Sequence, residues 1–241
     1  MSRRPISSPD MAVTPERFER HVRGLARLGY IGITTEAWLD HLERGRRLPR
    51  KPVIFTFDDG YAETAERALP VLERYGFGAV VFLVTHRVGD TAAWAADAAV
   101  AESQLLTEDE VRSWHARGVE FGSHTQTHPD LTSLSTEAAL KEIRESRDDL
   151  ESLLGTRPRS FAYPFGSFDA RSVEAVEETY ACAFSVRLGL SDFAEDPYRL
   201  GRFVVQRDDA APDLAATFRL GWHPRRRAQR LWAGVAGRAG S

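Results

Sequence analysis

Two adjacent carboxylates, Asp58 and Asp59, follow directly on the apolar run 53–57. Such a run is typical of a strand that is buried on both faces of a parallel sheet. Desolvating one carboxylate is costly, and two neighbouring carboxylates repel each other unless a cation or a shared proton relieves them. Gly60 allows a sharp turn, so both acids can face one cavity. Because Asp-Asp-Gly also forms ordinary solvent-exposed turns, this stretch alone leaves both interpretations open.

Two histidines four positions apart, His124 and His128, follow the short segment 119–122, which has the pattern of another strand. Pro129 disfavours helical angles at His128, so we place the pair on the loop after that strand. Each histidine alone is more often an ordinary surface or core residue. Together with an acid pair on the same rim, two imidazoles and one carboxylate suit a divalent metal. Zinc is the first expectation, although iron, manganese, cobalt and nickel suit the same ligands.

The two aspartates can then have different roles, one as a metal ligand and the other as a base. If one binds the metal, the other is free to act as a base toward a water molecule that the metal polarises. The cation would also keep the second carboxylate ionised. A backbone N–H in the turn Pro164-Phe165-Gly166 could help to bind the developing oxyanion. The combination predicts metal-assisted hydrolysis of an amide or ester, without identifying the substrate.

The elements that must position these residues alternate along the chain. Capping residues predict helices from Thr14, Thr107 and Ser135. The apolar segments predict strands at 53–57, 79–84, 119–122, 160–163, 181–186 and 203–205. This alternation is the signature of a parallel α/β fold, in which loops at the carboxyl ends of the strands share one face. We see no internal repeat or linker, so we expect a single domain over residues 1–241.

Composition narrows the class of protein. A hydrophobic content of 42% with 28% charged residues is ordinary for a soluble globular protein. The net charge of −3 predicts no general affinity for nucleic acid. The single cysteine, Cys182, excludes an intrachain disulfide and fits a reducing compartment. The first eight residues have no apolar run typical of a secretory signal, and no stretch is long enough to span a bilayer. We therefore expect a cytoplasmic location.

The end of the chain is basic. No acidic residue follows Asp213, whereas several arginines lie between Arg219 and Arg238. This pattern favours a solvated basic tail from about residue 219. The functional alternative is a basic helix that makes peripheral contact with an acidic membrane surface or a partner.

Three segments in this order resemble the first three motifs of the polysaccharide deacetylase family: Thr56–Gly60, Ser123–Pro129 and Phe161–Gly166. The order and spacing match too, and the resemblance spans roughly Thr14 to Val205. It implies a distorted (β/α) barrel with about seven parallel strands. It also implies removal of N-acetyl, sometimes O-acetyl, groups from amino sugars.

Carried over position by position, the resemblance gives each motif residue a role. It makes Asp58 the base, assigns Asp59, His124 and His128 to the metal, and places the backbone of Phe165 in the oxyanion hole.

The chain departs from the family pattern at two important points. Ala162 stands where many members have an arginine that orients the base, and Arg202 or Arg199 could substitute. For Arg199 a plain surface charge is nearly as good an interpretation. The late Leu-x-His motif that supplies a general acid is also absent, and His86 and His223 are weak candidates for that role.

We therefore expect a metal-dependent deacetylase that acts on an acetylated amino sugar, oligosaccharide or glycoconjugate. Two alternatives remain: a hydrolase of a small amide or cyclic imide, and a metal-binding carbohydrate-binding protein without turnover.

Overall fold

A parallel sheet of five strands forms the centre of the computed structural model, which describes residues 13–186, 196–205, 209 and 211–220. Its strands lie side by side in chain order: β3 (Phe55–Phe57), β4 (Ala79–Leu83), β5 (Glu120–Ser123), β6 (Ser160–Ala162) and β7 (Cys182–Phe184). Two shorter strands, β1 (Ile31–Gly32) and β2 (Pro52–Val53), pair with each other in a separate parallel sheet. The predicted parallel α/β barrel is therefore confirmed as an open half-barrel, with five of the seven described strands in the main sheet.

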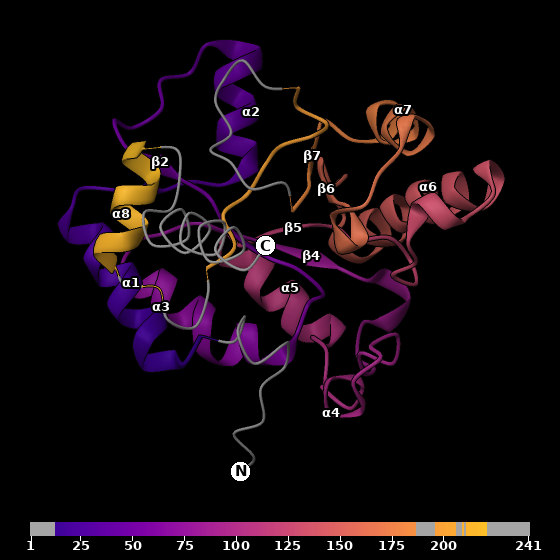
Figure 1. Cartoon of the computed structure of the whole chain (residues 1–241), viewed down its shortest axis with the longest axis horizontal. Helices are drawn as coiled ribbons and strands as arrows, with labels where there is room; N and C mark the ends of the chain where they lie inside the picture. The colour runs from indigo at the N-terminus through magenta and orange to yellow at the C-terminus, as the bar shows by residue number, and fades with distance from the viewer. Residues whose placement is uncertain (1–12, 187–195, 206–208, 210, 221–241) are drawn as a thin grey trace, which may run out of the picture.

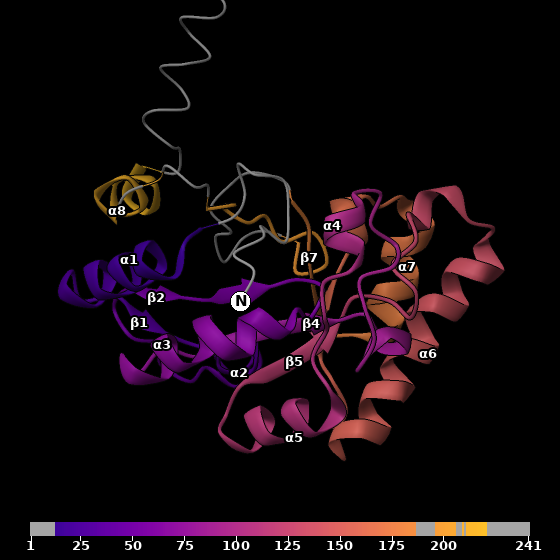
Figure 2. The same cartoon turned by 90° about the horizontal axis from the view of Figure 1, so that it is seen from below.

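Helices connect the strands and cover the sheet (Figures 1 and 2). In chain order they are α1 (Pro15–Arg27), α2 (Thr35–Arg44), the π-helical turn η1 (Thr64–Ala68), α3 (Leu69–Arg74), α4 (Ala98–Ala101), α5 (Glu108–Ala116), α6 (Thr136–Leu154), α7 (Ala170–Thr179) and α8 (Ala211–Leu220). Short 3₁₀ turns are η2 (Thr85–Arg87), η3 (Leu131–Ser133) and η4 (Pro164–Gly166). In both views α1 and α3 lie toward one end of the molecule and the packed pair α6 and α7 toward the other.

The predicted helix starts are confirmed. The side chain of Thr14 caps α1, Thr107 forms a capping box with Glu110, and Ser135 caps α6. Each cap satisfies a backbone N–H that the first helical turn would otherwise leave unpaired. No described helix is long and apolar enough to cross a membrane.

Strand β4 is buried on both faces, as the apolar run 79–84 predicted. Val81 and Leu83 belong to the core that α1, α3 and α5 complete. Val80 and Phe82 belong to a second core, which includes side chains of α2 and β7. Successive side chains of a strand point to opposite faces, so β4 is held from both sides. The polar loop at the carboxyl end of β4 therefore follows a strand that is packed on both faces.

The opposite end of the sheet is organised around Glu120, the first residue of β5. Its carboxylate accepts hydrogen bonds from the Thr35 hydroxyl, from the Ser160 hydroxyl at 2.9 Å and from the Glu36 N–H at 3.1 Å. The Glu120 carboxylate on β5 is thus hydrogen-bonded both to the first turn of α2 and to β6. Burial is the main cause that raises the pKa of Glu120, to about 7, against the lowering effect of these hydrogen bonds.

Two predicted strands differ from the structure. The run 53–57 is interrupted at Ile54 because Val53 pairs with β1 whereas Phe55 pairs with β4. The segment 203–205 is not a strand, and a single parallel bridge joins Leu200 to Phe184 instead. Beyond that bridge the chain leaves the sheet, which brings Arg202 to the end of β3.

Candidate active site

The turn after β3 separates the two aspartates. Asp59 has a φ of 71° and Gly60 a φ of 75°. A Cβ at Gly60 would lie 2.6 Å from the Leu83 side chain, so both the conformation and the space require glycine. As a result, Asp58 faces Arg202 whereas Asp59 faces the two histidines.

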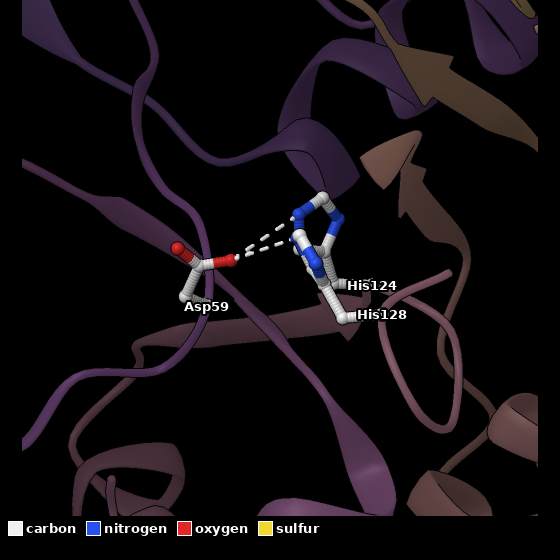
Figure 3. A group of neighbouring side chains, drawn as sticks. All are labelled: Asp59, His124 and His128. Carbon is white, nitrogen blue, oxygen red and sulfur yellow. Dashed lines mark ion pairs between the residues drawn. The ribbon is translucent and has the colours of Figure 1, made fainter. Parts of the chain in front are cut away.

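Asp59, His124 and His128 converge on one point (Figure 3). The Oδ1 atom of Asp59 lies 3.4 Å from His124 Nε2 and 3.3 Å from His128 Nε2. Both histidines are buried, and one ligand atom from each of the three residues lies within 4.8 Å of the other two. The structure thus brings together all three residues that the sequence suggested as metal ligands.

The hydrogen bonds of this group show that it suits a cation. His124 Nδ1 lies 2.7 Å from the Ala162 carbonyl, which can only accept, so Nδ1 carries the proton in the neutral ring. Burial lowers the pKa of His124 despite the opposing effects of Asp58 and Asp59. Its Nε2 therefore directs a lone pair at Asp59 Oδ1, an atom that is buried without a hydrogen-bond donor among the described residues. Lone pairs that face one another at this distance repel unless a cation lies between them.

Asp58 is held by Arg202 in a two-point ion pair. The Nη1 and Nη2 atoms of Arg202 donate to Oδ1 and Oδ2 of Asp58 at 2.6 and 2.7 Å. Burial would raise the pKa of Asp58, but the charge of Arg202, together with His124, the Arg202 hydrogen bonds and His128, outweighs burial and lowers the pKa to about 2. Asp58 is therefore ionised at neutral pH, and each of its oxygens retains a lone pair for another donor.

Arg202 is itself fixed in place. Its Nη1 also donates to the Thr56 hydroxyl at 3.2 Å, its Nε donates to the Ser185 carbonyl at 3.1 Å, and only 12% of its side chain is exposed. Arg199 instead pairs with Asp196 at 3.3 Å, with 44% of its side chain exposed. Of the two arginines suggested by the sequence, Arg202 thus lies on Asp58 and Arg199 is a surface charge.

Aromatic rings surround His128. The indole ring of Trp94 stacks on His128, with centroids 4.9 Å apart and an interplanar angle of 27°. The ring of Phe165 lies edge-on to His128 at 4.7 Å and is 60% exposed. Phe165 is the second residue of η4, where a backbone N–H has no partner within the turn. The structure therefore brings the backbone of Phe165 to the rim where the sequence placed it.

Four described residues other than glycine have a positive φ, and all four lie in the three motifs. They are Asp59 at 71°, Thr125 at 69°, His128 at 63° and Phe165 at 58°. Such conformations cost of order 1–3 kcal/mol each for residues with a side chain, and they cluster at functional sites. The sequence gives no sign of this strain because glycine, its usual marker, is absent from these positions.

The sequence suggested two weak candidates for the general acid, His86 and His223. His86 lies on η2, with its Nε2 2.8 Å from Gln126 Nε2 and 3.5 Å from Asp149 Oδ2. His86 therefore belongs to a polar network with Gln126 and Asp149, next to the loop that carries His124 and His128. His223 lies outside the described residues.

Sequence reasoning missed Tyr61, whose phenol lies close enough to Asp59 for the carboxylate to affect its pKa. Burial and the charge of Asp59 raise the pKa of this phenol, so it remains a donor. The sequence feature that could have identified Tyr61 is its position directly after the Asp-Asp-Gly turn.

Comparisons with known proteins identify the family of the chain. A sequence profile of the family described as polysaccharide deacetylase matches residues 45–181. YxkH of Bacillus subtilis, which is named after this family, is 26% identical over 200 residues, which cover 83% of this chain and 67% of YxkH. The poly-beta-1,6-N-acetyl-D-glucosamine N-deacetylase of Staphylococcus epidermidis is 25% identical over 212 residues, which cover 82% of this chain and 69% of that protein.

Among solved structures, the fold is similar to that of the Streptococcus pyogenes deacetylase PplD in complex with acetate. The TM-score is 0.78 at 22% identity, and the match covers 90% of this chain and 92% of PplD. This similarity concerns the fold, whereas the sequence profile covers more than half of the chain and all three motifs. The chain belongs to the polysaccharide deacetylase family.

Proposed function

We propose that this protein is a metal-dependent hydrolase that removes N-acetyl groups from an amino-sugar glycan. The observation that carries the proposal is that two adjacent carboxylates, Asp58 and Asp59, have different partners. Asp59 faces two histidine nitrogens, which suits a cation, whereas Asp58 faces a guanidinium, which keeps it ionised. A hydrolase of this kind needs both a cation site and a free carboxylate base next to it.

Asp59, His124 and His128 would hold the metal, with zinc as our first choice for three ligands of this type. A divalent cation bound there supplies Lewis-acid polarisation of a carbonyl oxygen and lowers the pKa of water.

The protein's own residues then perform the proton transfer and orient the substrate. Asp58 accepts the proton of the attacking water through a lone pair that Arg202 leaves free. Arg202 fixes the plane of the carboxylate through its two hydrogen bonds. The backbone N–H of Phe165 donates to the acetyl oxygen as negative charge develops on it. The exposed ring of Phe165 and the ring of Trp94 exclude water from one side of His128.

The substrate class follows from the family and from its named members. The Staphylococcus epidermidis relative is named as a deacetylase of a polymer of N-acetylglucosamine. We therefore propose an acetylated amino sugar in an oligosaccharide, polymer or glycoconjugate as the substrate of this chain.

The test is release of acetate from N-acetylglucosamine oligomers by the purified protein, with and without a chelator. We expect acetate release that the chelator abolishes and that added zinc restores. Absence of acetate release from any acetylated sugar, in a protein shown to contain metal, would contradict the proposal. Turnover of a small cyclic imide in its place would identify the site as that of a different amide hydrolase.

The location in the cell and the basic tail remain predictions. Almost all of the tail from residue 219 lies outside the described residues. We propose a cytoplasmic protein with a solvated basic tail, and peripheral contact of that tail with acidic membrane lipids is the alternative. Fractionation at low salt checks this, because a protein found wholly in the soluble fraction would exclude the membrane contact.

A further inference from the structure

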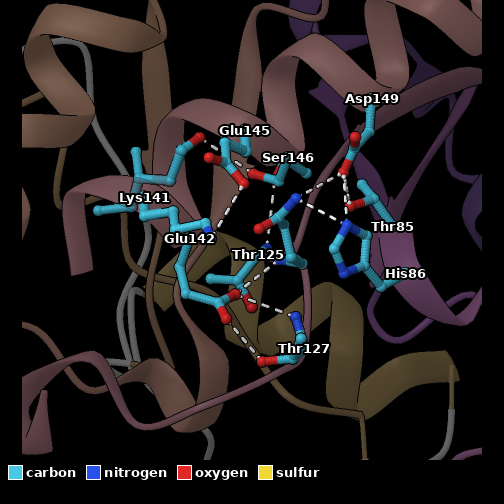
Figure 4. Close-up of polar contacts among 12 residues, drawn as sticks. Thr85, His86, Thr125, Thr127, Lys141, Glu142, Glu145, Ser146 and Asp149 are labelled. Atoms are coloured by element: carbon cyan, nitrogen blue, oxygen red, sulfur yellow. Dashed lines mark hydrogen bonds and ion pairs between the residues drawn. The ribbon is translucent and has the colours of Figure 1, made fainter. Parts of the chain in front are cut away.

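Beside its buried apolar residues, α6 carries a row of polar side chains that are half-buried or buried. Glu142, Ser146 and Asp149 follow the i, i+4, i+7 spacing that places residues on one side of a helix. All three form hydrogen bonds to the segment 123–127, which contains the first of the two histidines and leads to the second (Figure 4). We call these three residues the α6 polar stripe.

Glu142 makes the most direct contacts of the α6 polar stripe. Its Oε2 accepts the backbone N–H groups of Gln126 at 2.8 Å and Thr127 at 3.0 Å. Its Oε1 accepts the Thr127 hydroxyl at 2.6 Å. Successive N–H groups that converge on one carboxylate form an anion-binding turn, and bonds to an ionised acceptor are stronger than neutral ones.

The other two members fix the flanks of the same loop. Asp149 Oδ2 accepts the Gln126 amide at 3.1 Å and the Thr85 hydroxyl at 2.6 Å, which ties the loop to η2. The hydroxyl of Ser123, the last residue of β5, donates to Ser146 Oγ at 2.7 Å. Gln126 is only 4% exposed, so its amide depends on these protein partners rather than on water.

This loop needs external support because its own conformation is unfavourable. Thr125 and His128 both have a positive φ, at 69° and 63°. Strained residues persist only where surrounding contacts determine the conformation. The residues directly between them, Gln126 and Thr127, are the ones whose N–H groups Glu142 binds.

We propose that Glu142 is a positioning residue for the metal site, whose carboxylate fixes the loop between His124 and His128 so that both Nε2 atoms converge on Asp59. The inference rests on the proposed metal site but not on the identity of the substrate. The hydrogen bonds of Glu142 in the described part of the chain go to Gln126 and Thr127 rather than to the proposed ligands, so Glu142 acts through the loop.

The test compares Glu142→Gln with Glu145→Gln in metal-free protein titrated with Zn²⁺ against a competing chelator. Glutamine has nearly the same volume as glutamate, but it lacks the charge, and its one amide oxygen can replace only one of the two carboxylate oxygens that accept from the loop. We expect about 10- to 100-fold weaker zinc binding for E142Q, the usual effect of losing a residue that orients metal ligands. Glu145 lies on the same helix, and its exposed pair with Lys141 is 3.9 Å long. E145Q removes the same charge and should bind zinc as the wild type does.

A second measurement reads the loop directly. Amide hydrogen exchange in the metal-free proteins should be faster at Gln126 and Thr127 in E142Q and unchanged in E145Q. If E142Q does not fold, Glu142→Asp replaces it, because this variant keeps the charge but withdraws the carboxylate by one methylene. A folded E142Q or E142D that binds zinc as tightly as the wild type would overturn the inference.

The two proposals fail in different ways. A wild type that binds no divalent metal refutes the proposed function and the role of Glu142 in metal binding, whereas exchange at Gln126 and Thr127 still reports whether Glu142 holds the loop. A wild type that binds zinc but releases no acetate refutes only the proposed function.

Discussion

Replacing Arg202 by glutamine should remove the group that keeps Asp58 ionised and correctly oriented. Glutamine can make one hydrogen bond to the carboxylate, but it has neither the charge nor the two-point geometry of the guanidinium. The contacts at 2.6 and 2.7 Å would both be lost or weakened. We therefore expect R202Q to impair both stability and catalysis.

The size of the stability effect follows from the pKa of Asp58, which is about 2 in the folded protein against 3.8 for the free side chain. A lowered pKa means that the folded state holds the proton less tightly, so this stabilisation is present above pH 3.8 and is lost as the pH falls toward 2. This shift of about 1.8 pKa units corresponds to about 2.5 kcal/mol, of which the charges of His124 and His128 supply a part. Leaving one partner of a buried pair unpaired typically costs roughly 3–5 kcal/mol. Because 29% of the Asp58 side chain is exposed, we expect the lower end of that range.

The catalytic effect should be larger than a loss of stability alone explains. A general base contributes roughly 10²- to 10⁴-fold to a rate, and R202Q should lose about 10²- to 10³-fold of kcat with little change in KM. The assay is acetate release from N-acetylglucosamine oligomers at a temperature where circular dichroism shows the variant folded and metal analysis shows it loaded. Arg199→Gln is the matched control, because it removes an exposed arginine of the same segment that pairs with Asp196 instead. Equal activity of R202Q and R199Q would refute the role of Arg202.

Three further substitutions test other parts of the argument. Asp58→Asn should retain the metal but lose about 10²- to 10⁴-fold in kcat, because an amide cannot accept the proton; normal hydrolysis by this variant would make the assignment of the base wrong. His124→Ala should lose both metal and activity, and a full metal content after dialysis would contradict it. The raised pKa of Glu120, about 7 against 4.5, predicts that the contribution of Glu120 to the unfolding free energy is fully present below pH 4.5 and falls by up to about 3 kcal/mol as the pH rises through 7. Glu120→Gln should abolish that dependence in urea titrations, and an unchanged pH dependence would show that another group causes it.

The site could be predicted from the sequence to the extent that it depends on strand ends. Asp58 directly follows β3 and His124 directly follows β5, and the carboxyl ends of parallel strands meet at one edge. Arg202 could be named only as one of two candidates, because its approach to Asp58 depends on how the chain leaves the sheet after Leu200. The location of β1 and β2 in a separate sheet could not be predicted, since two residues are too short to show a period.

The α6 polar stripe could not be recognised for a different reason. In sequence, Glu142 and Asp149 are ordinary charged residues of an amphipathic helix, where a solvated face is the usual interpretation. Their partners are backbone N–H groups and side chains of a loop about twenty residues upstream. Only the packing of α6 against β5 and η2 brings the two segments together.

The strain at the site explains why such support is needed. At most positions glycine would relieve a positive φ, but at Asp59 and His128 the side chain is itself a proposed metal ligand, so the strain cannot be removed without losing the site. Several kcal/mol of backbone strain is a substantial part of the 5–15 kcal/mol or so that keeps a typical domain folded. It must be offset by contacts that only the strained conformation permits. The His128 N–H donates to the Thr125 hydroxyl at 3.0 Å, and Glu142 binds the two residues between them. The geometry of the proposed metal site therefore depends on acceptors for backbone N–H groups as well as on its three proposed ligands.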